Sequence, residues 1–264
     1  MAEIGRLVRA PQARPWLTPV SLLRAVIVLT VLLIWQAAAV SGLLYRDVVP
    51  PLPAIGAALV KLLSSVDFYW NLWFTIDEIA IGLVLGGVAG VVAGLVIGGN
   101  KFIAKAFEPY LYYIGPTPKI IFFPIMIMWF GAGAGSKIAM GAVSCFFPIA
   151  LNVAAGMRQI DQVLIKVGLS FRANPWQMAT KIYLPAMRQP VINGLRLGLG
   201  VALIGTLLAE TKISNRGLGF VVIDAYNTFN MPRLYAILIV LFVLAIGANV
   251  LITRLGRLDE IKQK

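Results

Sequence analysis

The residues of this chain that could take part in chemistry include a few acids at the ends of long apolar runs. Asp77 and Glu78 stand at the start of one run, and Glu210 stands at the end of another. Acidic side chains in membrane segments often line ion or solute pathways, so each is a candidate pathway residue. The alternative is that each carboxylate is solvated at a membrane surface.

Two neutral polar residues, Asn152 and Thr206, lie deeper in apolar runs. In hydrocarbon an amide or hydroxyl needs a partner or water, so both are candidates for a pathway, and hydrogen bonding between helices is the alternative. An aromatic and methionine cluster contributes two further candidates, for which packing is the alternative. The predicted pathway residues are therefore Asn152, Thr206, Glu210, Phe123 and Met126.

The composition excludes several common types of catalytic and metal site. With no His and one Cys, the chain has no His-ligated metal, Ser-His-Asp triad, Cys-His pair or internal disulfide. It contains no GxxxxGKS or GxxxxGKT sequence to cradle nucleotide phosphates, so we predict no cofactor in this chain. No pair of Asp residues lies deep in an apolar run, which argues against an intramembrane aspartyl protease.

The overall composition is that of a membrane protein. Of the 264 residues, 59% are hydrophobic and 13% are charged, with a mean hydropathy of +0.86. A soluble domain would carry roughly 25% charged residues. The net charge of +12 could suggest nucleic-acid binding, but the basic residues flank apolar runs, so we expect membrane topology and no nucleic acid.

Six stretches have the length and polarity of membrane helices. About 20 helical residues cross the hydrocarbon core, and charges inside such a stretch are rare. The predicted spans are 25–44, 79–99, a short stretch at 120–135 preceded by a proline-broken segment at 109–118, 138–157, 190–209 with Arg196 near its start, and 234–253. The first could instead be a signal peptide, with cleavage near Ala37, but it is longer than a typical signal sequence, so we expect an uncleaved helix.

The basic residues also predict orientation. Seventeen of the 23 Lys and Arg residues fall in the tails and alternate loops that six spans place on one side. By the positive-inside rule this side is the cytoplasm, with both termini. We expect a cytoplasmic tail at 1–24, one transmembrane domain at 25–256 with a cytoplasmic loop at about 161–189, and a second tail at 257–264.

The second span carries glycine at every fourth position, and these glycines are Gly82, Gly86, Gly90, Gly94 and Gly98. They form one stripe without side chains along a helix, so another backbone can approach closely. The stripe could allow sliding during gating or serve static packing.

The sequence of the loop at 161–189 predicts two short helices. Asn174 is a good N-cap, Pro175 suits the first helical position and Gln177 completes a capping box. We expect this helix to stop near Leu184, because Pro185 disfavours helical geometry in the residue before it. With an earlier helix at about 162–170, the loop could dock into a partner's groove or lie on lipid headgroups.

The same loop resembles the coupling loop of permease subunits in bacterial ABC importers of the nitrate, sulfonate, taurine and bicarbonate type. Their signature is Glu-Ala-Ala, three residues, Gly, nine residues, Ile, one residue and Leu-Pro. Ile182, Leu184 and Pro185 match its end, and Ala173, Trp176 and Gln177 match residues common before it. Other similar runs include WFGAGAGSKI from Trp129, FFPIALN from Phe146, GLRLGLG from Gly194 and NRGLGFVVIDA from Asn215.

Both hallmark positions of the signature are changed here. The Gly falls on Arg172, and the Glu-Ala-Ala falls on the triplet that begins at Lys166 and ends at Gly168. The change implies a differently shaped turn, a co-adapted partner groove or weakened coupling. The predicted ATPase-coupling residues are Lys166, Gly168, Arg172, Ala173, Asn174, Trp176, Gln177, Ile182, Leu184 and Pro185.

The resemblance implies an all-α fold of the type I ABC importer permease, with about six membrane helices in the bacterial inner membrane. It also implies two copies of an ATPase subunit that binds the ATP, a periplasmic solute-binding protein, a second permease copy and a small anionic solute. A self-sufficient secondary transporter is the alternative, but we find no inverted repeat and no central charge in the sequence.

Overall fold

The structure, a computed structural model, describes residues 19–42 and 48–261, and these residues form helices and no strand. The helices are α1 Pro19–Val40, α2 Leu52–Leu63, α3 Val66–Gly99, α4 Lys101–Ile114, η1 Lys119–Phe122, α5 Phe123–Phe130, α6 Ala134–Arg158, α7 Gln162–Ser170, α8 Pro175–Met178, η2 Ala179–Tyr183, α9 Leu184–Lys212, α10 Leu218–Asn227 and α11 Met231–Ile261. Of the predicted tails, residues 1–18 and 262–264 lie outside the described residues.

Five helices are long and apolar enough to cross a membrane, and a bent pair could make a sixth span. The single helices are α1, α3, α6, α11 and the continuous stretch from α8 through η2 to α9. The prediction of a separate span at 120–135 is wrong in its bounds. Instead, α4 pairs with the segment Lys119–Phe130 at a bend of 95°, because the Gly115–Pro118 break separates two helices that are each too short to cross alone.

The described residues fall into two compact units, one up to Ala57 and one from Ala58 onward. In the first unit, α1 begins at Pro19, inside the predicted N-terminal tail. Two side chains of α1 hold the proline-rich segment that follows it. The indole Nε1 of Trp35 donates to the carbonyl of Pro50 at 3.1 Å, and Gln36 Oε1 accepts from the backbone N–H of Leu52 at 2.8 Å.

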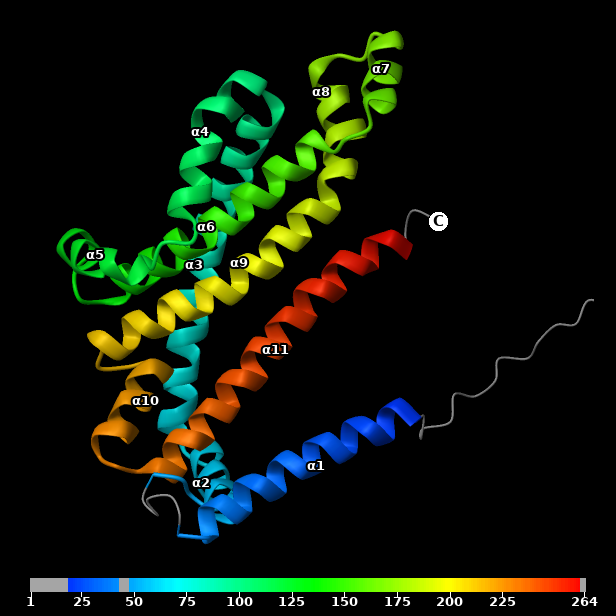
Figure 1. The fold of residues 1–264 in the computed structure, drawn as a ribbon. Coiled ribbons are helices and arrows are strands. Elements are labelled where there is room, and N and C mark those ends of the chain that lie inside the picture. The colour runs from blue at the N-terminus through cyan, green and yellow to red at the C-terminus, as the bar shows by residue number, and fades with distance from the viewer. Residues whose placement is uncertain (1–18, 43–47, 262–264) are drawn as a thin grey trace, which may run out of the picture. The chain divides into compact units, whose positions relative to one another are not determined.

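In the second unit, α6 lies between α3 and α9 and contacts both along most of its length (Figure 1). The glycine stripe of α3 faces α6, which confirms the predicted close approach. A Cβ added at these glycines would meet the carbonyl oxygens of Ile138, Ala142, Phe146, Ala150 and Ala154, one at every fourth residue of α6. The stripe therefore lets two backbones meet, and whether the helices slide there stays a prediction.

The two ends of this unit are built differently. One end carries α7 and α8, at the upper right of Figure 1. We call the other the far end, meaning the start of α3, the turn between α9 and α10, α10 itself and the start of α11. Its apolar centre is formed by buried side chains of α2, α3, α10 and α11, including Leu62, Phe68, Val221 and Ile237.

Candidate functional site

The first helix of the coupling loop, residues 161–189, forms where the sequence predicts it. α7 runs over Gln162–Ser170, and the carboxylate of Asp161 caps its start by accepting from the N–H of Val163 at 2.8 Å. The capping box of α8 is also confirmed. Asn174 Oδ1 accepts from the N–H of Gln177 at 2.8 Å, and Gln177 Oε1 accepts from the N–H of Asn174 at 2.9 Å.

The turn between α7 and α8 takes a form that usually contains glycine. Arg172 has a φ of 51°, in the left-handed region. The N–H of Ala173 bonds to the carbonyl of Gly168 at 3.0 Å, and that of Arg172 to Leu169 at 2.9 Å, which together make a Schellman motif. Of the three alternatives for Arg172, the structure argues against a differently shaped turn: the arginine keeps a glycine-type turn, at a strain of about 1 kcal/mol.

Close packing explains why the altered triplet ends in the small residue Gly168. It is buried, and a Cβ added there would lie 2.5 Å from the Sδ of Met178 and would also collide with Ile182. A larger residue would require the ends of the Met178 and Ile182 side chains to move. Lys166, in contrast, is exposed, so its replacement of the signature glutamate leaves the packing of the loop unchanged.

The predicted helix stop at Leu184 is wrong. The helix continues from Pro175 to Lys212, a stretch of 38 residues. A proline ring normally clashes with the carbonyl four residues earlier, but here the chain forms a π turn just before it, and the N–H of Leu184 bonds to the carbonyl of Ala179. The wider turn accommodates Pro185 without breaking the rod.

The loop exposes apolar side chains at its surface. Phe171 is 83% exposed and Trp176 is 76% exposed, and Leu169 and Leu184 are also exposed. These four residues form what we call the apolar patch of the coupling loop. Ile182 and Ala173 are half-buried beneath it. Exposed aromatic side chains on a rigid helical loop are typical of a surface that a partner covers.

The predicted pathway residues lie inside the helical unit. Thr206 is fully buried, and its hydroxyl donates to the carbonyl of Lys137 at 3.5 Å, a long contact between α9 and α6. Half-buried Asn152 donates its amide to the carbonyl of Pro148 within its own helix at 2.8 Å. Phe123 and Met126 are buried in one apolar cluster. The structure thus shows partners for these side chains, and their role in a pathway stays a prediction.

The alternative that the acids are solvated at a membrane surface is wrong for two of the three. Glu78 is 2% exposed and Glu210 is 1% exposed, whereas Asp77 is exposed. Glu210 Oε1 accepts from the hydroxyl of Thr75 at 2.7 Å, and its Oε2 accepts from the N–H of Gly219 at 2.6 Å. The acid is buried because α9 continues past the predicted end of its span and packs against α3.

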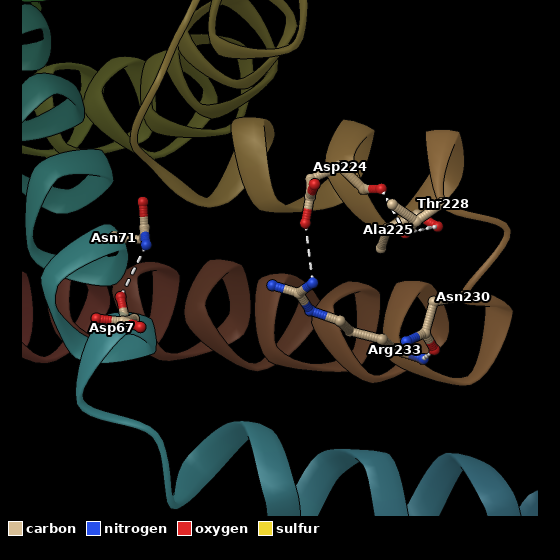
Figure 2. Close-up of polar contacts among 7 residues, drawn as sticks. All are labelled: Asp67, Asn71, Asp224, Ala225, Thr228, Asn230 and Arg233. Atoms are coloured by element: carbon tan, nitrogen blue, oxygen red, sulfur yellow. Dashed lines mark hydrogen bonds and ion pairs between the residues drawn. The ribbon is translucent and has the colours of Figure 1, made fainter.

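Further hydrogen bonds tie the turn after α9 to α3. Thr75 Oγ1 accepts from the N–H of Leu218, and Asn71 Oδ1 accepts from the N–H of Gly217, both at 2.7 Å. The amide of Asn71 in turn donates to the carbonyl of Asp67 at 2.7 Å (Figure 2). The side chains of one helix thus satisfy backbone groups of a turn far away in the sequence.

The run NRGLG owes its glycines to Glu210. A Cβ at Gly217 would lie 2.5 Å from the carboxyl carbon of Glu210, and one at Gly219 would lie 2.5 Å from its Cβ. Gly217 also has a φ of 98°, which favours glycine. A glutamate seven and nine residues before this glycine pair was the sequence signal for a carboxylate buried under the turn.

Sequence reasoning missed Lys137. The side chain is 2% exposed, and its Nζ donates to the carbonyls of Ala132 and Gly133 at 3.3 and 3.1 Å. It therefore holds the turn between α5 and α6. Glu78 lies in the same region, and one of its oxygens has no hydrogen-bond partner among the described residues.

Comparison with known proteins decides the family. The profile described as binding-protein-dependent transport system inner membrane component matches residues 82–258, more than half of the chain. The chain belongs to this family. As a permease of an ABC importer, it is a multi-pass inner-membrane transport component and not an enzyme, and it works with an ATPase and a solute-binding protein.

Several relatives cover most of the permease. The SsuC permease protein of Bacillus subtilis, named for transport of aliphatic sulfonates, is 30% identical over 80% of this chain and 76% of its own. The taurine permease TauC of Escherichia coli is 28% identical over 85% of each chain, and the nitrate import permease NrtB of Synechococcus elongatus is 26% identical over 74% and 73%. A structure of the inward-facing MetNI methionine ABC transporter shares the fold, with a TM-score of 0.64 at 19% identity over 79% of this chain and 98% of that one.

Proposed function

We propose that the permease moves a small anion through a pathway shared by two copies of this chain, powered by two ATPase subunits that dock on the coupling loop. Relatives named for sulfonates, taurine and nitrate support an anionic solute. The excess of Lys and Arg in the tails and in the loops on the same side supports a cytoplasmic coupling loop and cytoplasmic termini.

The observation that carries the proposal is the unbroken helix from the coupling loop to the far end. α8, η2 and α9 form one continuous helix of 38 residues, whose contour length at about 1.5 Å per residue is roughly 57 Å. Trp176 stands at one end of this rod, and buried Glu210 stands at the other. A displacement of the loop by an ATPase would therefore reach the opposite side of the membrane through one continuous helix.

The apolar patch supplies the contact for that displacement. Tryptophan and other large side chains that become buried in a partner's groove contribute most of the binding energy in such interfaces. The patch is rigid because Gly168 packs α7 closely against Met178. A rigid exposed patch transmits force better than a mobile loop, since it does not have to become ordered on binding.

The test is substitution of Trp176, the one tryptophan of residues 161–189. Trp176→Glu should lower the amount of ATPase that co-purifies with the permease at least tenfold, because a carboxylate cannot enter an apolar groove without losing its hydration. Trp176→Phe keeps an aromatic ring and should retain most of the co-purification. Equal thermal midpoints of the two variants in detergent would show that the spans remain folded.

Two outcomes would contradict the proposal. One is unchanged co-purification in Trp176→Glu, which would remove the coupling loop as the ATPase contact. The other is solute uptake by vesicles that contain the permease alone, without any ATPase, which would favour a secondary transporter.

A further inference from the structure

The far end of the permease contains a basic cavity that the coupling role does not use. It has a volume of about 700 Å³ and is lined by Ala132 and Gly133 on one side and by the residues from Lys212 to Arg216 on the other. The two charged lining residues are both cations, Lys212 and Arg216, and both are exposed. Within the described residues, neither makes an ion pair with a carboxylate within 4 Å.

Hydrogen bonds from two buried side chains, Lys137 and Glu210, hold the backbone at or next to both walls of this basic cavity. Lys137 donates to the carbonyls of Ala132 and Gly133, which fixes the first wall. Glu210 accepts from the N–H of Gly219 and from Thr75, which fixes the chain directly after the second wall. Walls held in this way lose little freedom when a ligand binds.

One of the two cations, Arg216, is also oriented. The guanidinium of Arg216 lies over the ring of Phe74, 4.3 Å from its centroid. Ser214 bonds through its hydroxyl to the carbonyl of Arg216 and accepts from the N–H of the same residue at 3.3 Å. A cation stacked on an aromatic ring and next to a closed turn points in one direction instead of sampling many.

We propose that this basic cavity receives an acidic side chain of the solute-binding protein when that protein docks on the permease. The inference rests on the proposed orientation, in which the far end faces the periplasm. A volume of about 700 Å³ is far larger than a single small anion requires, but it suits a protruding protein segment. The two cations, neither of which forms an ion pair with a described carboxylate within 4 Å, offer the complementary charge for its carboxylate.

A second ionic contact at the far end is already satisfied and serves as a contrast. Arg233 of α11 donates to the carboxylate of Asp224 of α10 at 2.8 Å (Figure 2). The neighbouring cavity of about 410 Å³ is lined by Arg233 together with Lys61, Ser65 and Asn230. Because its arginine is paired, this second cavity has less positive charge to offer, and Lys61 is a suitable control for the effect of charge alone.

The test measures binding of the purified, solute-loaded binding protein to the permease with its ATPase, in nanodiscs of phosphatidylcholine without nucleotide. The double variant Lys212→Gln, Arg216→Gln should raise the Kd at least tenfold and lose the salt dependence of association between 0.15 and 0.5 M, which at these ionic strengths reports screened charges. Lys61→Gln should change the Kd less than about twofold, since its charge lies outside the basic cavity.

Zero-length carbodiimide crosslinking gives a direct readout. It should join the Lys212 amine to a carboxyl group of the binding protein, and Lys212→Arg should abolish that crosslink while it keeps the charge. Unchanged Kd in the double variant would overturn the proposal.

The proposal would also be overturned if the Kd depended on Lys212 and Arg216 only in nanodiscs that contain phosphatidylglycerol. That result would indicate that the cavity binds a lipid headgroup. Displacement of the binding protein by sulfate only in the wild type, without any crosslink, would instead indicate a site for a free anion. Because docking is measured without nucleotide, its failure is distinct from failure of the ATPase contact at Trp176.

Discussion

The coupling loop and the far end of this permease are held together by interactions of different range. In the coupling loop, the stabilising hydrogen bonds join residues two to five positions apart, as in the pairs Asp161 with Val163 and Asn174 with Gln177. At the far end, Thr75 and Glu210 are 135 positions apart. The loop is therefore a local structure with an exposed surface, whereas the far end is a tertiary structure built on buried polar groups.

The difference suits the two proposed roles. A docking surface must remain exposed and still keep its shape, and local caps provide this without a large core. The turn at the far end has to stay attached to α3 while α9 transmits movement. Buried charge-assisted hydrogen bonds are stronger than neutral ones and costly to break, so they make this attachment firm.

The largest effect should follow from removing the acid at the far end. Glu210→Ala leaves the N–H of Gly219 and the hydroxyl of Thr75 buried without an acceptor, so we expect a loss of about 3 kcal/mol in stability. The measurement is the thermal midpoint of the purified permease in detergent. Glu210→Gln, which keeps one acceptor oxygen, should lose less.

Asp77→Ala is the matched control, because Asp77 is an exposed acid on the same helix as Thr75. It should leave the midpoint unchanged. If Asp77→Ala and Glu210→Ala lowered the midpoint equally, the far end would depend on net charge and not on the buried hydrogen bonds.

A smaller and local effect is expected in the coupling loop. Asn174→Ala removes the capping box of α8, which should cost about 1 kcal/mol of local stability. Hydrogen exchange of the amides at 176–178 should become about fivefold faster, with no change in the thermal midpoint of the spans. Asn174→Asp keeps an acceptor at the cap, so its amides should exchange as in the wild type. A lowered thermal midpoint in Asn174→Ala would contradict the prediction, because it would mean that the coupling loop also contributes to the stability of the spans.

The same difference in range explains what the sequence could predict. The limits of α7 and the capping box of Asn174 follow from neighbouring residues and were confirmed. The stripe of glycines on α3 also predicted a close helix contact, because its period matches a helix face. The burial of Glu210 was missed, because its partner Thr75 belongs to another helix and the only local signal was the glycine pair after it.

Two other failures arose where a local rule had a structural exception. Pro185 was expected to end its helix, but a π turn over Ala179–Tyr183 removes the clash and the rod continues. The segment near Gly115 was expected to lead into a separate span, but α4 and Lys119–Phe130 form a pair bent by 95°. In both cases the residues indicated a break in the helix without indicating its geometry.

The smallest effect concerns a feature that both regions share. Arg172 in the coupling loop and Phe229 at the far end each occupy the left-handed position of a Schellman turn, with φ of 51° and 54°. Arg172→Gly should relieve strain of up to about 1 kcal/mol, partly offset by the greater freedom of glycine in the unfolded chain. The expected result is exchange up to fivefold slower at the amides of Arg172 and Ala173.

Arg172→Ala separates the backbone from the side chain, since alanine keeps the strain but lacks the guanidinium. If the turn alone matters, alanine should exchange like arginine and all three variants should bind the ATPase equally. If glycine and alanine both weaken ATPase binding, the guanidinium contacts the partner, and the substitution at the signature position is an adaptation to an acidic groove. Because Arg172 is exposed and Gly168 fixes the turn beneath it, either result can be assigned without a change in the rest of the loop.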